Sequence, residues 1–118
     1  QGVSSAASDV YKRQAFKCRT ISGKPVKDRQ TRTGAYFIKE HQTHRILRGE
    51  NYATPVNNWV RIMWTGTGFH GAPWQPWSRW SKTLYRSRGS HGCLNLSPSD
   101  SKKIYDLTKY REMVFIHY

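Results

Sequence analysis

Acidic residues and cysteines are scarce in this chain. Its 118 residues include 7 Asp and Glu against 20 Lys and Arg, so the formal net charge at pH 7 is +13. The two cysteines, Cys18 and Cys93, match neither a disulfide framework nor the ligand spacing of a zinc site, although in an oxidising compartment a bridge between them would consume a reactive thiol. No apolar run approaches the roughly 20 residues that a membrane-spanning helix needs, and residues 1–14 lack the apolar centre of a secretory signal. The sequence therefore predicts one small domain, or a piece of one, with no metal, no cofactor and no transmembrane segment.

The basic residues are spread along the chain, from Lys12 to Arg111, rather than gathered in one run. A large positive charge of this kind indicates, in this order, a solvated basic surface, attraction to an anionic matrix and specific nucleic-acid recognition. Anionic polymers are therefore kept as partners, and no specific nucleic acid is expected.

The first fourteen residues differ from the rest. They show no apolar periodicity, and their end, residues 9–14, resembles the translated adapter sequence found at the ends of gene fragments. We interpret residues 1–14 as a non-native or disordered segment and place the domain at residues 15–118; a natural disordered terminus is the alternative.

Short apolar segments separated by Gly, Pro and Ser turns indicate a mainly β domain. Strands are expected at residues 35–39, 58–64 and 113–116, the last of them buried. The polar segment 41–54 is expected to be a loop or an edge hairpin, and the Trp- and Ser-rich segment 71–86 a long loop of the kind that often carries function.

Local patterns predict one strand face and one helix. Trp59 and Trp64 lie in the expected strand 58–64 and are assigned to the core. Ser97 is an N-cap residue, with Pro98 at the first helical position and Asp100 at the third, so a helix is expected to begin there.

The most reactive arrangement in the chain is the segment Arg88–Asn95. Cys93 lies in a glycine-flanked turn beside His91, and His70 lies upstream in another glycine-flanked segment. A lone cysteine is more often a small buried apolar residue, but polar, glycine-rich surroundings favour a partly exposed thiol. A thiol nucleophile acts as the thiolate, so an imidazole must take its proton, and tight turns aim backbone N–H groups at the developing oxyanion. A zinc site formed by the same three side chains is disfavoured, because the turn constrains Cys93 and His91 and no second ligand pair exists.

The segment Ser90-His91-Gly92-Cys93-Leu94-Asn95, with His70 upstream, resembles the L,D-transpeptidase (YkuD) catalytic domain family, most closely the enzymes of Gram-positive bacteria. The resemblance extends from Ser22 to the C-terminus and includes Ser22-Gly23-Lys24-Pro25, Thr33-Gly34, Pro55-Val56-Asn57, Trp64-Thr65-Gly66 and Trp74-Gln75-Pro76. It implies a β-sandwich of mixed sheets with a helix after the cysteine turn, and a domain that lacks its first strands.

The resemblance also implies how the reacting groups are divided. Cys93 is the nucleophile, His70 is its base, and the carbonyl of Gly71 orients the imidazole. Backbone amides near Gly92 and Cys93 form the oxyanion hole.

Further roles follow from the same resemblance. His91 and Ser90 shape the site, while Arg88 and Asn95 hold the loop or contact the donor stem. Trp74 and its neighbours Trp77 and Trp80 either line the substrate cleft or pack as a lid, and the residue pattern favours neither.

The implied activity is peptidoglycan cross-linking outside the cytoplasm, in the bacterial cell wall. Family members attack a tetrapeptide stem, release its terminal D-alanine and pass the acyl group from the cysteine thioester to the amine of a second stem, giving a 3→3 cross-link. Carbapenems inhibit many of them by acylating the cysteine. Two alternatives remain: hydrolysis of the thioester, as in an L,D-carboxypeptidase, and a non-catalytic basic module that binds cell wall or nucleic acid.

Overall fold

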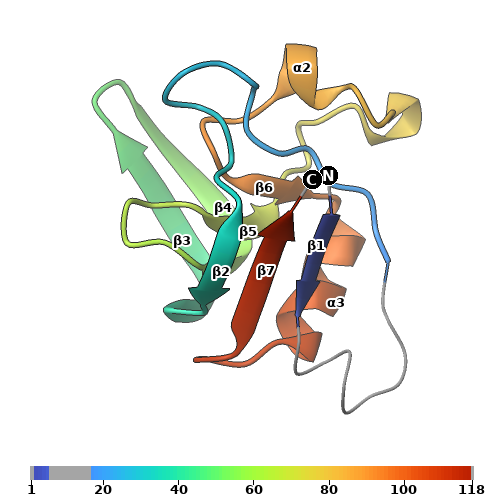
Figure 1. Ribbon diagram of the computed structural model, residues 1–118. Coiled ribbons are helices and arrows are strands. Elements are labelled where there is room, and N and C mark those ends of the chain that lie inside the picture. Colours follow the sequence, from blue (N-terminus) through green and yellow to red (C-terminus); the bar gives the residue numbers. More distant parts are fainter. Residues whose placement is uncertain (1, 6–16, 118) are drawn as a thin grey trace.

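The computed structural model describes residues 2–5 and 17–117, and it shows a mainly β domain (Figure 1). The elements in chain order are β1 (Gly2–Ser5), β2 (Gly34–Phe37), β3 (Glu40–Gly49), β4 (Tyr52–Arg61), β5 (Gly68–Gly71), the 3-10 helix η1 (Trp77–Arg79), α2 (Tyr85–Arg88), β6 (Leu94–Leu96), α3 (Pro98–Leu107) and β7 (Met113–His117). None of the described helices is long and apolar enough to cross a bilayer.

The strands form two sheets that face each other across one core. One sheet has the order β1-β7-β2 and the other β3-β4-β5-β6. Side chains from the two sheets, and from the residues that directly follow β2 and β4, form the core cluster Ile38, Val60, Ile62, Phe69, Leu94, Leu96, Val114 and Ile116. The expected β-sandwich is confirmed. Only the four-stranded sheet is mixed, however, because β5 and β6 are its one parallel pair, and both pairs in the β1-β7-β2 sheet are antiparallel.

The polar segment 41–54 is a hairpin rather than a loop. It belongs to β3 and β4, strands of ten residues each, paired from Glu40 opposite Arg61 to Gly49 opposite Tyr52. The hairpin projects from the body of the domain (Figure 1). Solvent reaches most of its side chains, which explains why no simple apolar alternation marked the strands in the sequence.

The second half of the expected strand 58–64 is not a strand, and here the assignment of Trp64 to the core is wrong. Trp59 is fully buried, but Trp64 is 69% exposed. β4 ends at Arg61, and a turn follows in which the Gly66 N–H donates to the Met63 carbonyl. The apolar alternation in the sequence continues to Trp64, whereas the strand ends at Arg61, so the alternation does not report burial at Trp64.

Helix α3 begins as its sequence predicts. The Ser97 side chain accepts a hydrogen bond from the Asp100 N–H, and Pro98 occupies the first turn. Ile104 packs against the core from this helix.

The last strand, β7, is buried on one face only: Val114 and Ile116 are buried, but Phe115 is 38% exposed. A side-chain period of two places Phe115 on the outer face of β7, so the expectation of a wholly buried strand is wrong.

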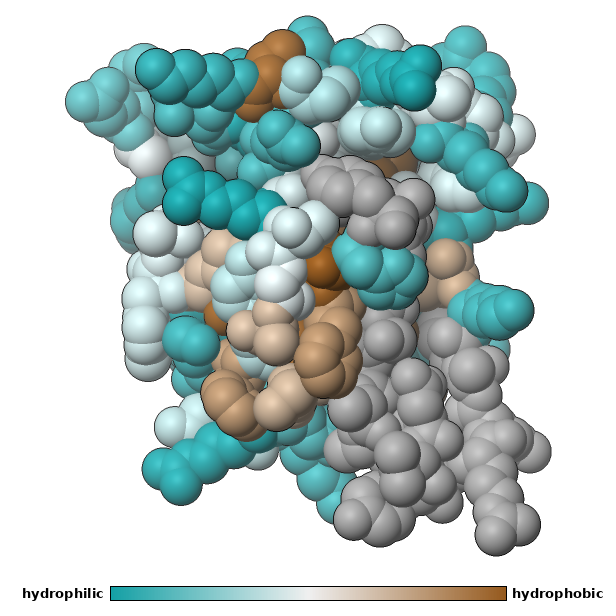
Figure 2. Space-filling model, viewed as in Figure 1, coloured by the Kyte–Doolittle hydropathy of each residue, from teal (hydrophilic) through white to brown (hydrophobic). Residues whose placement is uncertain are grey.

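The outer face of the β1-β7-β2 sheet carries apolar side chains. Phe37 and Phe115 are both exposed there, and in the view of Figure 1 hydrophilic side chains gather over the upper loops while a more apolar area lies lower (Figure 2).

Residues Gly2–Ser5 form β1, which pairs with β7 along its whole length. Main-chain pairing needs no apolar periodicity, so the sequence pattern did not indicate this strand. Positions 1 and 6–14 of the segment interpreted as non-native or disordered lie outside the described residues, and that interpretation stays a prediction.

Candidate active site

The parallel pairing of β5 with β6 brings together the three residues singled out by the motif. His70 lies opposite Asn95 in this ladder, and Cys93 comes directly before β6, two residues from Asn95. Residues two apart share a face of a strand, so His70, Cys93 and Asn95 are directed to the same side. They line one cavity of about 360 Å³.

His70 is held as a neutral base. Its Nδ1 lies 2.9 Å from the carbonyl oxygen of Gly71, which can only accept, so Nδ1 carries the proton and Nε2 keeps its lone pair. Burial lowers the pKa of His70, although the bond to the Gly71 carbonyl acts in the opposite direction. Gly71 is needed here because a Cβ at this position would lie 2.9 Å from the Ser101 hydroxyl. The ring is therefore fixed, uncharged and able to accept a proton.

The Cys93 thiol is half-buried and forms no disulfide. The second cysteine, Cys18, is also free and lies exposed on the surface. Burial raises the pKa of the Cys93 thiol, and a backbone hydrogen bond at Gly68 and the charge of Arg61 act against that rise. Its Sγ lies 3.5 Å from the carbonyl oxygen of Gly66, to which it donates. The resting sulfur is thus a thiol, and a base must remove its proton before it attacks.

The cysteine turn is braced by two hydroxyl groups. The Ser90 hydroxyl donates to the Cys93 carbonyl and accepts from the Gly92 N–H at 3.1 Å. The buried Thr31 hydroxyl donates to the Gly92 carbonyl at 2.7 Å. Gly92 has φ +132°, a conformation that side chains disfavour. The Gly92 amide, one of the two expected oxyanion donors, is therefore occupied by Ser90, whereas the Cys93 N–H has no acceptor among the described residues.

The remaining residues expected in the site fall into two groups. His91, Ser90 and Trp74 line the cavity with Cys93, and the Trp74 ring lies 5.9 Å from that of His70. Arg88 does not line it: its side chain is exposed, and only its carbonyl contributes, as acceptor of a 3.0 Å bond from the Gln75 side chain.

The other two tryptophans of the loop are pinned by their indole N–H groups. Trp77 donates to the Ala72 carbonyl at 2.8 Å and Trp80 to the Thr20 carbonyl at 3.0 Å. Neither lines the cavity that contains Cys93. Of the three, Trp74 alone lines that cavity, and the others pack the loop.

Within residues 2–5 and 17–117, no group of three or more His, Cys, Asp or Glu side chains is disposed to hold an ion. The cavity beside Cys93 contains thiol, imidazole, hydroxyl and amide groups, which suit acyl transfer.

Comparison with known proteins agrees with this geometry. The family model of the YkuD L,D-transpeptidase catalytic domain matches residues 8–116. The chain belongs to this family.

Individual relatives show how much of them the domain represents. L,D-transpeptidase 2 of Mycobacterium tuberculosis is 31% identical over an alignment of 94 residues, and the match covers 71% of this chain and 22% of that protein. The structure described as the Ldtfm-avibactam carbamoyl enzyme is 34% identical, with a TM-score of 0.75 over 84% of this chain and 39% of that one. A cysteine-to-serine variant of the Enterococcus faecium L,D-transpeptidase gives 34% identity and a TM-score of 0.72, over 81% of this chain and 38% of that one. The chain therefore spans well under half the length of these relatives.

Several residues of this L,D-transpeptidase domain border Cys93 without a motif to mark them. Leu47, Tyr52 and Thr54 reach the cavity from the β3–β4 hairpin, and the Tyr52 ring stacks on His91 at 6.1 Å. Gln75 lies on the cavity wall, 8% exposed, and neither its Oε1 nor the Oδ1 of Asn95 has a hydrogen-bond donor among the described residues. In the sequence, Gln75 stood out only as part of Trp74-Gln75-Pro76. The sequence offered a hairpin at 41–54 as one alternative, but it did not indicate that this hairpin reaches Cys93.

Cys93 also borders a second cavity. This one measures about 340 Å³, and Arg45, Arg48 and Arg61 contribute to its wall. A larger cavity of about 660 Å³ lies behind the cysteine turn, where Lys27, Arg32 and Gly92 line it, but neither Cys93 nor His70 reaches it. The sulfur thus borders both a cavity that contains His70 and one that contains arginines.

Proposed function

We propose that this domain is a peptidoglycan L,D-transpeptidase that forms 3→3 cross-links through a thioester on Cys93. The observation that supports this most directly is the shared cavity of Cys93 and a neutral His70 whose Nδ1 is tied to the Gly71 carbonyl. Among the described residues, no carboxylate lines that cavity or bonds to the imidazole, so a main-chain carbonyl does the orienting.

Acylation is the first step of the proposed reaction. Nε2 of His70 takes the proton of the Cys93 thiol, and the sulfur attacks the carbonyl carbon of the third residue of a tetrapeptide stem. The oxyanion that forms is stabilised by the Cys93 N–H, the amide that the turn leaves available. The C–N bond to the terminal D-alanine then breaks, and its nitrogen takes the proton from His70. The products are a thioester and free D-alanine.

The second step transfers the acyl group. The side-chain amine of another stem attacks the thioester carbon, His70 accepts a proton from that nitrogen, and the sulfur leaves and is reprotonated. Attack by water at the same point would release a tripeptide stem instead, which is the L,D-carboxypeptidase alternative. Analysis of products from a donor stem incubated with an acceptor amine separates the two: a cross-linked dimer supports transfer, and the tripeptide alone supports hydrolysis.

Cell-wall material is the proposed setting. Stem peptides carry carboxylates and the Gram-positive wall carries anionic polymers, so a chain with a net charge of +13 is attracted to both, and the proposed location is outside the cytoplasm. Binding to purified wall is expected to weaken as salt rises; binding that is insensitive to salt would count against this use of the charge.

The proposal is tested by intact-protein mass spectrometry after incubation with a carbapenem, with Cys93→Ala in parallel. The name of the 34% identical carbamoyl enzyme describes an avibactam adduct, which supports the choice of a covalent probe. One adduct on the parent chain and none on the variant is the expected result. Absence of an adduct on a chain shown to be folded by circular dichroism would favour the non-catalytic binding module.

A further inference from the structure

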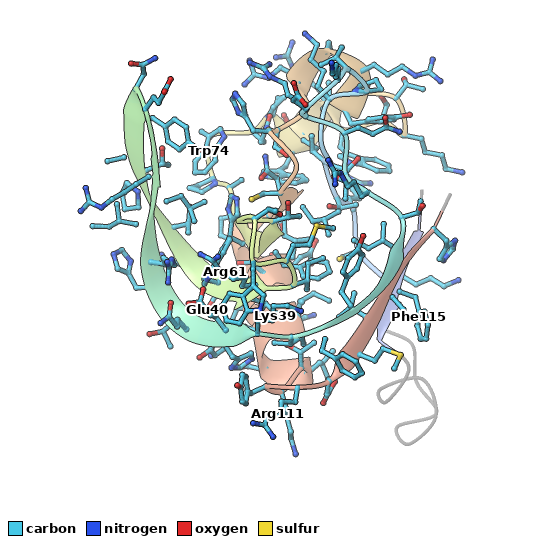
Figure 3. All side chains as sticks on the ribbon, turned by 60° about the vertical axis from the view of Figure 1, so that its left-hand side comes forward. Lys39, Glu40, Arg61, Trp74, Arg111 and Phe115 are labelled. Atoms are coloured by element: carbon cyan, nitrogen blue, oxygen red, sulfur yellow. The ribbon has the colours of Figure 1, made fainter. Side chains whose placement is uncertain are left out.

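Three arginines line the cavity beside Cys93, and Arg61, the last residue of β4, is the most firmly held of them. It lines the 340 Å³ cavity together with Cys93 and Gly66, and its charge acts on the Cys93 thiol. Its side chain is 13% exposed, whereas Arg48 in the same cavity wall is exposed. Figure 3 shows Arg61 beside Glu40 at the base of the β3–β4 hairpin.

Contacts on several sides fix the Arg61 guanidinium. Its Nε forms an ion pair with Oε1 of Glu40, and its NH1 donates to the Trp64 carbonyl at 3.1 Å. The guanidinium also lies over the rings of Trp59 and Trp64, at 5.7 and 5.9 Å from their centres. A cation held in this way loses little freedom when a neighbouring group becomes charged.

The charges around Arg61 do not cancel. Glu40 pairs with both Arg61 and Arg45, so two guanidinium groups share one carboxylate and a net charge of +1 remains. No Asp or Glu is among the described residues that line either cavity bordering Cys93. The sulfur therefore faces a positive potential from the hairpin side, where a thiolate is favoured.

Arg61 also supports the turn that touches the sulfur. Its bond to the Trp64 carbonyl holds the segment between Met63 and Thr67, and Gly66 in that segment accepts from Cys93 Sγ. One side chain thus connects the hairpin base, the turn and the thiol.

We propose that Arg61 is a positioning residue that favours the Cys93 thiolate. Arg61 stabilises the negative sulfur that His70 creates, and it does so from the second cavity that borders Cys93. The inference rests on the proposed function only in that Cys93 must react as a thiolate.

Other titratable or charged groups also face the sulfur. They are His70 from β5, His91 from the cysteine turn, Tyr52 from β4, and Arg45 and Arg48 from β3. The test therefore measures all variants over the same series of pH values, so that these groups affect the Cys93 thiol pKa equally in each variant.

The experiment measures the rate of iodoacetamide alkylation of Cys93 against pH in a Cys18→Ser background, which removes the second free cysteine. Iodoacetamide is neutral, so the arginines do not attract it, and its rate of reaction reports the fraction of Cys93 that is thiolate. In Arg61→Gln we expect the thiol pKa to rise by about one unit, with alkylation about tenfold slower below that pKa. Arg61→Lys, which keeps the charge, should recover most of the rate. Arg79→Gln is the matched control, because Arg79 is an exposed arginine in η1, outside both cavities.

A second variant predicts the opposite sign. Glu40→Gln removes the shared carboxylate while the Trp64 carbonyl still holds Arg61, so the pKa of Cys93 should fall. This variant keeps the test decisive if Arg61→Gln fails to fold. A rise in Glu40→Gln, an unchanged thiol pKa in folded Arg61→Gln, or an equal shift in Arg79→Gln would overturn the inference.

The proposed function and this inference fail in different ways. A carbapenem adduct together with an unshifted pKa in Arg61→Gln would overturn the role of Arg61 and leave the function standing. A shifted pKa without any adduct or transfer product would support the role of Arg61 and remove the function.

Discussion

The two walls of the cavity around Cys93 are built differently. The wall formed by β5, β6 and the cysteine turn is closed: His70 and Asn95 are 3% and 2% exposed, and Gly71, Ser90 and Thr31 are all hydrogen-bonded within it. The wall formed by the β3–β4 hairpin is open, with Tyr52 49% exposed. The hairpin has few buried contacts beyond its base, and such segments open at low cost.

This difference separates chemistry from recognition. Groups that move protons must be held within tenths of an ångström, and burial with main-chain hydrogen bonds achieves that. Groups that admit a substrate must yield to it, which suits an exposed hairpin. We therefore expect changes in the closed wall to alter the chemical step and changes in the open wall to alter binding.

The largest effect is expected from His70→Ala. Loss of a general base costs about 10²–10⁴-fold in rate, so acylation of Cys93 by a donor stem should fall by about three orders of magnitude. Because burial lowers the pKa of His70 below its ordinary value of 6.5, the parent should lose activity only when the pH drops below that value, and this acid limb should vanish in the variant. Stopped-flow acylation across a pH series measures both.

Cys93→Ser in the same series gives the background signal without the thiol nucleophile. An acid limb that persists unchanged in His70→Ala would assign the titration to another group and contradict the closed wall as the seat of proton transfer.

A smaller effect is expected from Gly71→Ala, which disturbs the support of His70 without touching its ring. The new Cβ would lie 2.9 Å from the Ser101 hydroxyl, which is itself held by bonds to the Pro98 carbonyl and the Asn58 side chain. Overpacking of this kind costs about 1–3 kcal/mol, and a displaced imidazole should slow acylation by about tenfold to a hundredfold. Thermal unfolding and acylation rate are the two measurements.

The double variant Gly71→Ala with Ser101→Ala tests the cause. Removing the Ser101 hydroxyl removes the nearest obstacle, so part of the lost rate should return. If the double variant is as slow as the single one, the close approach to Ser101 is not what requires glycine at this position.

The closed wall also contains the residues that the sequence singled out. Cys93, His70 and the Ser97 cap are each marked by residues within a few positions of them, and local chemistry such as a glycine-flanked turn or an N-cap needs little tertiary context. The mainly β character followed from the local turns, and the sandwich followed from the resemblance.

What the sequence did not indicate depends on contacts between distant positions. Tyr52 reaches Cys93 because β3 and β4 pair over ten residues, and Arg61 does so because β4 ends there and Glu40 lies opposite in the register. Trp64 was assigned to the core because it continues the apolar alternation of the segment 58–64, but the strand ends at Arg61 and Trp64 is exposed. Strand β1 had no side-chain pattern to reveal it, since its support is main-chain pairing with β7.

The smallest effect, and the sharpest test of the open wall, is expected from Tyr52→Ala. The ring lines both cavities beside Cys93 and stacks on His91, and aromatic contacts of this kind contribute about 0.5–1.5 kcal/mol beyond their area. KM for the donor stem should rise by about threefold to tenfold, while kcat and the unfolding temperature stay near those of the parent, because an exposed side chain supports little of the core. Tyr52→Phe keeps the ring and should behave like the parent. A drop in kcat at unchanged KM would place Tyr52 with the chemical step, and the division between a closed catalytic wall and an open binding wall would then be wrong.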